Sequence, residues 1–267
     1  MPVMTGTKMI KLIKQINSTI PIIIITAFND TDYLFEAIKL NVTNYLTKPL
    51  NLFALSEVLA SIAKNINLEN ENKEIFNDIS LNLGHKEKIA IVGANGVGKS
   101  TLLKIMAGLI EPSSGEIELF HNLIKNKRDF EKYRDDIGYL PQDVSSFFLC
   151  ITVIEDIMFS LQTLGIGKKE AYDKSKEILK NLNILHLENR VIYELSGGEQ
   201  KIVALASILV KEPKILLLDE PTNALDEESE NRILDILSKI DKSMIIVSHH
   251  KSFIEKIVSK IYNLSSI

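Results

Sequence analysis

The chain has little cysteine, no long apolar run and no excess of basic charge, and each absence excludes a class of protein. Cys150 is the single cysteine among 267 residues, so an internal disulfide is excluded and a reducing cytosol fits the sequence. The longest apolar runs, around 22–25 and 215–218, are strand-sized and far below the roughly 20 residues that a membrane-spanning helix needs. The 31 basic and 35 acidic residues are interspersed and give a net charge of −4, with no electrostatic footprint for nucleic acid. We therefore expect no nucleic-acid partner, and any membrane role must be peripheral.

The first residues lack the pattern of a secretory signal, because residues 1–20 are polar and periodic and no charged start precedes an apolar block. The opening MPVMTG runs directly into apolar residues at helical spacing, so we expect the chain to begin inside a domain. Apolar residues make up 45% of the sequence, which is ample for one or two packed domains.

The most informative segment is IAIVGANGVGKSTLLKIMAGL, which spans residues 89–109. Its pattern predicts a buried strand over 89–92, a glycine loop over 93–98 and a helix over 100–109. The loop fills every fixed position of G-x-x-x-x-G-K-[ST], the pattern in which backbone N–H groups and a helix N-terminus surround a phosphate. Lys99 is expected to reach the β- and γ-phosphates, and the Ser100 hydroxyl to ligate Mg²⁺. The predicted nucleotide-binding residues of this loop are Gly93, Asn95, Gly96, Gly98, Lys99, Ser100 and Thr101.

A second strand, over 215–218, ends in two carboxylates within EPKILLLDEPT. Carboxylates at the C-terminal end of a parallel strand face the crevice where α/β proteins bind ligands. Asp219 is placed to hold Mg²⁺ through water, and Glu220 is the candidate for polarising the attacking water. Alternatively, both are solvated acids in a plain turn with Pro221 and Thr222.

Between these motifs lies YELSGGEQKIVALASILV, in which Ser196 is a good helix N-cap and Glu199 completes a capping box. Alone this is only a well-made helix start. Together the motifs resemble the ATP-binding subunits of ABC transporters over about residues 62–267. The signature of that family is similar to Leu195-Ser-Gly-Gly-Glu199. Gln142 matches the family's Q-loop glutamine, Ala224-Leu-Asp226 its D-loop, and His249 its switch histidine.

The resemblance implies a P-loop NTPase of class α/β, with a three-layer core and a helical insert at about 143–195. It implies ATP and Mg²⁺ as cofactors, with Ser100, Gln142 and Asp219 at the metal. The catalytic residues implied are Glu220, His249, Gln142 and Lys99. His250 is the alternative to His249, but the family places its histidine directly after a strand-terminal Ser or Thr, which favours His249.

The resemblance also implies partners and a location. Two ATPase subunits, identical or different, work head to tail, with Ser196 and Gly198 of one completing the γ-phosphate site of the other. The pair would serve membrane permease subunits from the cytoplasmic face of the cell membrane. The stretches TVIEDIMFSLQTLGI and KKEAYDKSKEILKNLNI look most like the ATPases of energy-coupling-factor importers for cobalt, nickel or vitamins. The alternatives are a soluble ABC-type ATPase and a receiver-linked signalling adaptor, but soluble members usually carry two cassettes or a coiled coil, and this chain has one cassette and no heptads.

One family element departs from the pattern. The aromatic residue on which the family stacks adenine falls here on Asn70, within KNINLENENKEIF. An amide cannot replace a π-face stack, which contributes roughly 1–3 kcal/mol per base. We therefore expect weak nucleotide affinity.

Residues 1–61 resemble the second half of a response-regulator receiver domain, a flavodoxin-like fold used in phosphorelay. Helix, strand, helix, strand and helix are expected at 7–16, 21–26, 31–40, 42–46 and 52–62. Thr26, Tyr45 and Lys48 match the receiver's switch hydroxyl, switch aromatic and phosphate-contacting lysine. Asp30 and Asp32 fall in a helix start and cannot replace the phospho-acceptor, which would lie upstream. We therefore expect an incomplete receiver fragment over 1–61 joined to an ATPase domain over 62–267.

Overall fold

The computed structural model describes residues 6–16, 20–26, 44–47, 55, 58–59 and 75–264. The chain divides into two compact units, Met1–Glu74 and Ile75–Ile267, and each is described by itself.

The described part of the first unit includes a helix and a parallel pair of strands. They are α1 (Gly6–Ile16), β1 (Ile23–Thr26) and β2 (Asn44–Thr47), with Ile23 paired to Asn44. The helix predicted at 7–16 and the strands predicted at 21–26 and 42–46 are present, with β1 beginning at Ile23 and β2 spanning Asn44–Thr47. Of the helix expected at 52–62, the structure describes only residues 55, 58 and 59, which are helical. The helix expected at 31–40, together with Asp30, Asp32 and Lys48, lies outside the described residues.

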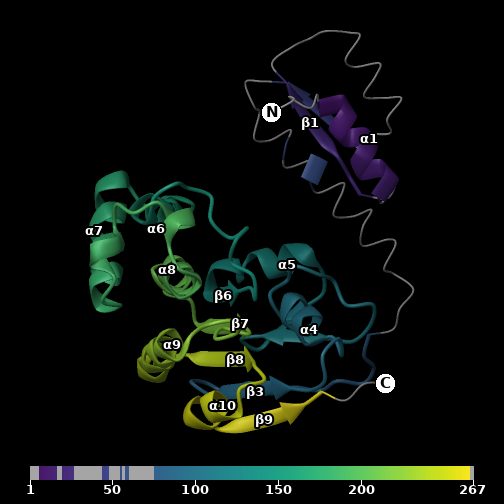
Figure 1. Cartoon of the computed structure of the whole chain (residues 1–267). Helices are drawn as coiled ribbons and strands as arrows, with labels where there is room; N and C mark the ends of the chain where they lie inside the picture. Colours follow the sequence, from purple (N-terminus) through teal and green to yellow (C-terminus); the bar gives the residue numbers. More distant parts are fainter. Residues whose placement is uncertain are drawn as a thin grey trace. The chain divides into compact units, whose positions relative to one another are not determined.

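The second unit is built on a five-stranded parallel sheet. Figure 1 shows its strands side by side in the order β6, β7, β8, β3, β9. Their bounds are β3 (Lys88–Val92), β6 (Ile137–Leu140), β7 (Ile215–Asp219), β8 (Ser243–Val247) and β9 (Lys260–Asn263). All neighbouring pairs run parallel, as expected for a sheet whose central strands are continuous apolar runs. A separate hairpin pairs β4 (Ile117–Leu119) with β5 (Asn122–Ile124).

Alternate side chains of the central strands enter two different hydrophobic clusters, which makes the unit three-layered. Leu217 and Ile245 pack in one cluster with residues of α4 (Lys99–Met106). Leu216 and Ile246 pack in the other, with residues of α8 (Gly197–Leu209) and α9 (Glu227–Lys239). These observations confirm the predicted P-loop architecture with helices covering the sheet.

Two helix boundaries show how local residues set the elements. Helix α4 ends at Met106 and not at Leu109 as expected, because Gly108 adopts a left-handed φ of 69°. Helix α8 begins after Ser196 with the predicted capping box: the Glu199 N–H donates to Ser196 Oγ, and Glu199 Oε2 accepts from the Ser196 N–H at 2.9 Å. Three further elements of the unit are α5 (Lys127–Glu131) and η1 (Arg134–Asp136), which precede β6, and α10 (Lys251–Ile257), which lies between β8 and β9.

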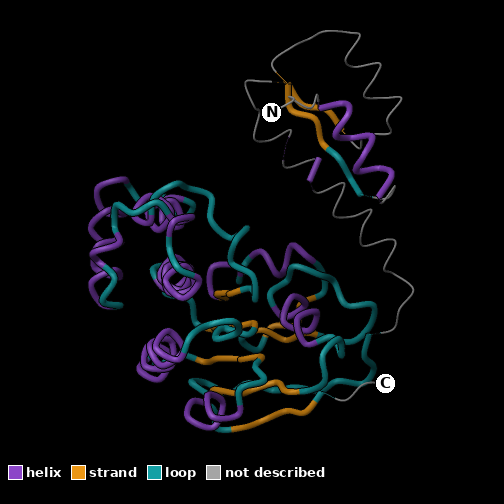
Figure 2. Tube along the Cα trace, viewed as in Figure 1, coloured by secondary structure: helices purple, strands orange, loops and turns teal. Residues whose placement is uncertain are grey.

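The helical insert contains α6 (Val153–Gln162), α7 (Lys168–Asn181), η2 (Leu185–Leu187) and η3 (Ile192–Glu194). Helices α6 and α7 pack against each other, as Figure 2 shows. Asp156 of α6 is buried and accepts hydrogen bonds from the backbone N–H groups of Leu149 and Cys150, at 2.9 and 3.2 Å. Its other carboxylate oxygen accepts from Ser207 Oγ of α8 at 3.0 Å. A single carboxylate therefore joins the segment before α6 to α8.

Within the described ranges, none of the helices combines the length and the apolar character needed to cross a bilayer.

Candidate functional site

Four neighbouring strands end at the residues that the sequence singles out. The loop 93–98 follows β3, Asp219 ends β7 and precedes Glu220, His249 lies two residues after β8, and Gln142 lies two residues after β6. Because the strands are parallel, all these residues lie at the same edge of the sheet. The Glu220 N–H donates to the carbonyl of Val247 at 2.9 Å and so joins the ends of β7 and β8.

The loop after β3 has the shape of a phosphate cradle. Gly98 adopts a φ of 98°, and a Cβ there would lie 2.3 Å from Cγ2 of Ile75. Gly96 also has a positive φ, of 80°, with no atom within 4 Å of the place where a Cβ would stand. Gly96 is thus required for its backbone conformation alone, and Gly98 for both its conformation and the close packing of Ile75. This geometry leaves the backbone free to approach a phosphate group.

Lys99 is the buried cation of this cradle. Its side chain is only 7% exposed and its Nζ donates to the carbonyl oxygens of Gly93 and Ala94, at 2.9 and 2.8 Å. The ammonium group therefore lies over the loop at the N-terminal end of α4, where the helix dipole also favours an anion.

Asp219 is buried at the end of β7 beside the cradle. One of its carboxylate oxygens, Oδ1, is buried without a hydrogen-bond partner. Burial raises the pKa of Asp219, opposed by a hydrogen bond from Ser100 and the charges of Lys104 and Lys99. A hydroxyl and a carboxylate with an unused oxygen, beside a phosphate cradle, fit the few protein ligands that Mg²⁺ takes in nucleotide sites.

Glu220 and His249 face each other across the ends of β7 and β8. Nε2 of His249 lies 3.1 Å from Oε1 of Glu220, a contact that is an ion pair only when the imidazole is protonated. The contact lacks the angular geometry of a hydrogen bond, and Oε1 is buried without a hydrogen-bond partner. Burial raises the pKa of Glu220, and the His249 charge opposes the rise. We expect Glu220 to polarise the attacking water, a role that requires the ionised carboxylate. ATP hydrolysis is therefore expected to fall on the acidic side at a higher pH than an exposed glutamate would give.

The signature residues lie at the start of α8, away from these strand ends in the sequence. Ser196 is exposed, and its side chain hydrogen-bonds to Glu199 of the same turn. Gly198 is buried against α9, where a Cβ would lie 2.3 Å from Oγ of Ser229. The N-terminus of α8 thus contacts the helix that follows the D-loop, which Asp226 caps by accepting from the Ser229 N–H.

Sequence reasoning missed two residues of the site, Lys201 and Tyr139. The roles predicted for Gln142 and Asn70 stay predictions. A lysine inside the apolar run of α8 was nevertheless a visible signal. Tyr139 lies near Asp219, and burial together with that carboxylate raises the pKa of Tyr139 to about 12. Gln142 is exposed after β6, and Asn70 lies outside the described residues.

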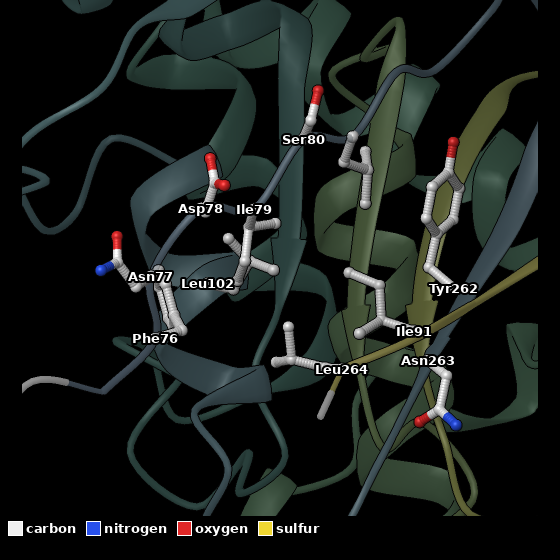
Figure 3. Close-up of a pocket in the computed structure, with 11 residues that line it drawn as sticks. Phe76, Asn77, Asp78, Ile79, Ser80, Ile91, Leu102, Tyr262, Asn263 and Leu264 are labelled. Atoms are coloured by element: carbon white, nitrogen blue, oxygen red, sulfur yellow. The ribbon is translucent and has the colours of Figure 1, made fainter. Parts of the chain in front are cut away.

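A cavity of about 230 Å³ lies next to the sheet, with its lining residues drawn in Figure 3. Its apolar walls come from the segment 76–81, from Ile91 of β3, Leu102 of α4 and Leu264 after β9. Asp78 is the only charged side chain among the lining residues that the structure describes, so the cavity lacks the cations of a phosphate site.

Comparisons with known proteins agree with this geometry. A family model described as "ABC transporter" matches residues 76–223, and one described as "Response regulator receiver domain" matches residues 1–60. An ABC transporter ATP-binding protein of Brucella suis is 42% identical over 195 residues, which cover 73% of this chain and 81% of the relative. The chain belongs to the ABC transporter ATP-binding family. Another family member, from Caldanaerobacter subterraneus, is 42% identical over 193 residues, covering 70% of this chain and 80% of the relative.

Solved structures of ABC cassettes share the fold. A dimeric structure of MJ0796, a bacterial ABC transporter cassette, has a TM-score of 0.66 at 27% identity and covers 73% of this chain and 89% of its own. CbiO1 of Clostridium perfringens, described as part of the ABC transporter complex cbiONQ, has a TM-score of 0.63 at 31% identity, covering 70% and 76%. The MJ0796 cassette is also solved in a post-hydrolysis state with ADP and Pi, with a TM-score of 0.65 at 28% identity, covering 71% and 86%. The predicted ABC-type ATPase and its ATP-binding cassette are thereby confirmed.

Proposed function

We propose that this ATPase couples ATP hydrolysis to transport through a separate membrane permease, with import of a metal ion or vitamin as its favoured task. The observation that carries the proposal is the set of three strand ends, of β3, β7 and β8, that gather Lys99, Asp219, Glu220 and His249 at one edge of an ABC cassette. Likeness to CbiO1, a component of the cbiONQ transporter complex, supports the import assignment.

Each residue of the edge has a proposed part in hydrolysis. The loop residues Gly93 to Thr101 bind the phosphates through backbone N–H groups, and Lys99 turns its ammonium from two loop carbonyls to the β- and γ-phosphates. Ser100, Asp219 and Gln142 would hold Mg²⁺, which when bound neutralises phosphate charge. Glu220 accepts a hydrogen bond from the attacking water and orients it, and His249 keeps the Glu220 carboxylate in place.

A second ATPase copy completes the site in this proposal. Ser196 and the N-terminus of α8 are accessible to a second ATPase subunit, because Ser196 is exposed and its side chain hydrogen-bonds to Glu199 of its own turn. The first N–H groups of a helix bind anions well, so α8 would cap the γ-phosphate held by the partner's Lys99 loop. The dimeric structure of the MJ0796 cassette supports pairing of two such ATPases.

An exposed apolar surface supports a permease partner at the cytoplasmic side of the membrane. Leu149, Ile151 and Tyr193 are 74%, 66% and 65% exposed. A β-bridge between Thr152 and Val191 holds their two segments together. We call these three residues the insert patch. Such large apolar side chains gathered at one place are typical of protein interfaces, here one with an apolar segment of the permease.

Replacing the insert patch residues Leu149 and Ile151 by serine should separate the ATPase from its permease. The exposed side chains contribute little to folding, so soluble ATP hydrolysis is expected to stay unchanged while co-purification with membrane proteins is lost. The measurement is affinity purification of the tagged chain from detergent-solubilised membranes of its own cells, followed by mass spectrometry. Leu109→Ser is the matched control, since Leu109 is 61% exposed elsewhere on the unit. If the parent chain recovers no polytopic membrane protein, it acts as a soluble ABC-type ATPase instead.

We further propose that the receiver fragment spans residues 1–61, that the ATPase spans 62–267, and that its helical insert spans about 143–195. The two compact units and the two family matches support a division close to this point. A chain lacking residues 1–61 is expected to keep its ATP-dependent rise in melting temperature, because the phosphate loop and its strand partners lie wholly in the second unit. Loss of ATP binding in the still-folded shorter chain would contradict this division.

A further inference from the structure

Lys201 is a charged residue at the start of a buried apolar run of α8. It lies on α8, is 5% exposed, and is followed by an almost wholly buried run over 202–210. Lysine is rarely this buried unless its ammonium group has partners, because removing the charge from water is costly. Here Nζ donates to two backbone carbonyl oxygens, of Glu220 at 2.9 Å and of Asn223 at 3.0 Å.

The two accepting carbonyls belong to the short loop that carries the hydrolytic carboxylate. Glu220 has a left-handed φ of 48° and Ala224 one of 61°, both unfavourable for residues with a side chain. A loop in this conformation persists only where its surroundings hold it. Within the loop, the Asn223 N–H donates to the Glu220 carbonyl oxygen at 3.1 Å. The ammonium group of Lys201, on helix α8, donates to the same oxygen.

The charges around Lys201 are consistent with an anchored ammonium group. Asp143, Asp219 and Glu220 all interact favourably with it and oppose the effect of burial, which lowers the pKa of Lys201. Its two hydrogen bonds go to main-chain oxygens, so it constrains the backbone path of the loop and leaves the Glu220 carboxylate free.

We propose that Lys201 is a positioning residue that fixes the hydrolytic loop, and with it Glu220, to the signature helix α8. The consequence rests on the proposed pairing of two copies: a phosphate bound at the N-terminus of α8 belongs to the ATP of the partner's site. A shift of α8 on that phosphate would carry the Lys201 ammonium with it and so move the Glu220 of its own chain. Each copy's Glu220 would then respond to the nucleotide held in the other site.

The test compares Lys201→Met and Lys201→Gln with the parent chain. Methionine keeps the buried length without donors and leaves two buried carbonyls unpaired, so kcat is expected to fall about 10- to 100-fold. Glutamine offers two N–H donors on a shorter side chain, so its kcat should fall only about 3- to 10-fold. In both variants the KM for ATP and the ATP-dependent rise in melting temperature are expected to stay at parental values. Lys239→Met is the matched control, on an α9 surface where the lysine side chain is 72% exposed.

The proposal is tested by the order of the kcat values, which is expected to be the parent chain first, then Lys201→Gln, then Lys201→Met. A Met variant as active as the control, a Gln variant no better than Met, or a loss found in KM and not in kcat would each overturn the positioning role. If Lys201→Met does not fold, the Gln variant decides: a lowered kcat with a parental thermal shift supports the proposal, and parental kcat refutes it. The assay measures hydrolysis by the full chain without a permease, so failure of transport coupling is read separately in the membrane purification.

Discussion

Glu220→Gln is expected to abolish steady-state ATP hydrolysis, lowering kcat by at least about 100-fold, the contribution typical of a positioned general base. Glutamine has nearly the shape of glutamate but no charge, so the water would lose the acceptor that orients it. Glu220 follows β7 and lies beside His249, which follows the neighbouring strand β8. No other carboxylate of the described site lies beside that histidine. ATP should still bind, because the phosphate loop is untouched.

The measurement is phosphate release under saturating ATP, together with the oligomeric state by light scattering. Since ATP is retained without turnover, the variant should accumulate as an ATP-bound dimer. Glu230→Gln is the matched control, because it makes the same chemical change outside the site. Glu230 lies on α9, and its Oε1 is 3.2 Å from Nδ1 of His250. An unchanged hydrolysis rate for Glu220→Gln would refute the assignment of this carboxylate.

Lys99→Ala is expected to remove nucleotide binding itself. Lys99 is 7% exposed and its ammonium group lies over the glycine loop, where we expect its charge to provide much of the phosphate affinity. For the parent chain, ATP at 100 times its Kd should stabilise the folded state by about 2.7 kcal/mol, seen as a higher melting temperature. In the variant this rise should vanish.

The unliganded melting temperature shows whether Lys99→Ala still folds, because the alanine also removes two hydrogen bonds to loop carbonyls. Lys174→Ala is the matched control on α7, where the side chain is 44% exposed and pairs with Glu170. Equal ATP-dependent shifts in the Lys99 variant and the control would show that the cradle does not bind the phosphates through this residue.

Local patterns were sufficient to predict much of this cassette. The strand, glycine loop and helix around Lys99 are contiguous in sequence, and so are the capping box of Ser196 and the strand that ends at Asp219. Each depends on backbone propensity and side chains within a few residues, which a sequence displays directly. The family resemblance added the order of motifs, which single residues such as Gln142 could not supply.

Contacts between distant segments could not be predicted in the same way. The ion pair of Glu220 with His249 joins residues 29 apart in number (249 minus 220), and Lys201 reaches the hydrolytic loop from another helix. Both depend on strand order and helix packing, which no local period encodes. The left-handed φ of Glu220 was also hidden, because sequence preference would place glycine at such a point.

The buried carboxylate of Asp156 has a mechanical consequence. One oxygen holds the backbone beside the insert patch, and the other holds Ser207, six residues along α8 from Lys201. Unpaired buried carboxylates are costly, so neither hydrogen bond can be given up cheaply when the patch is pushed. Helix α8 is therefore hydrogen-bonded at one position to the segment beside the insert patch and at another to the loop that carries Glu220. A displacement of the insert surface is expected to move α8, and with it that loop.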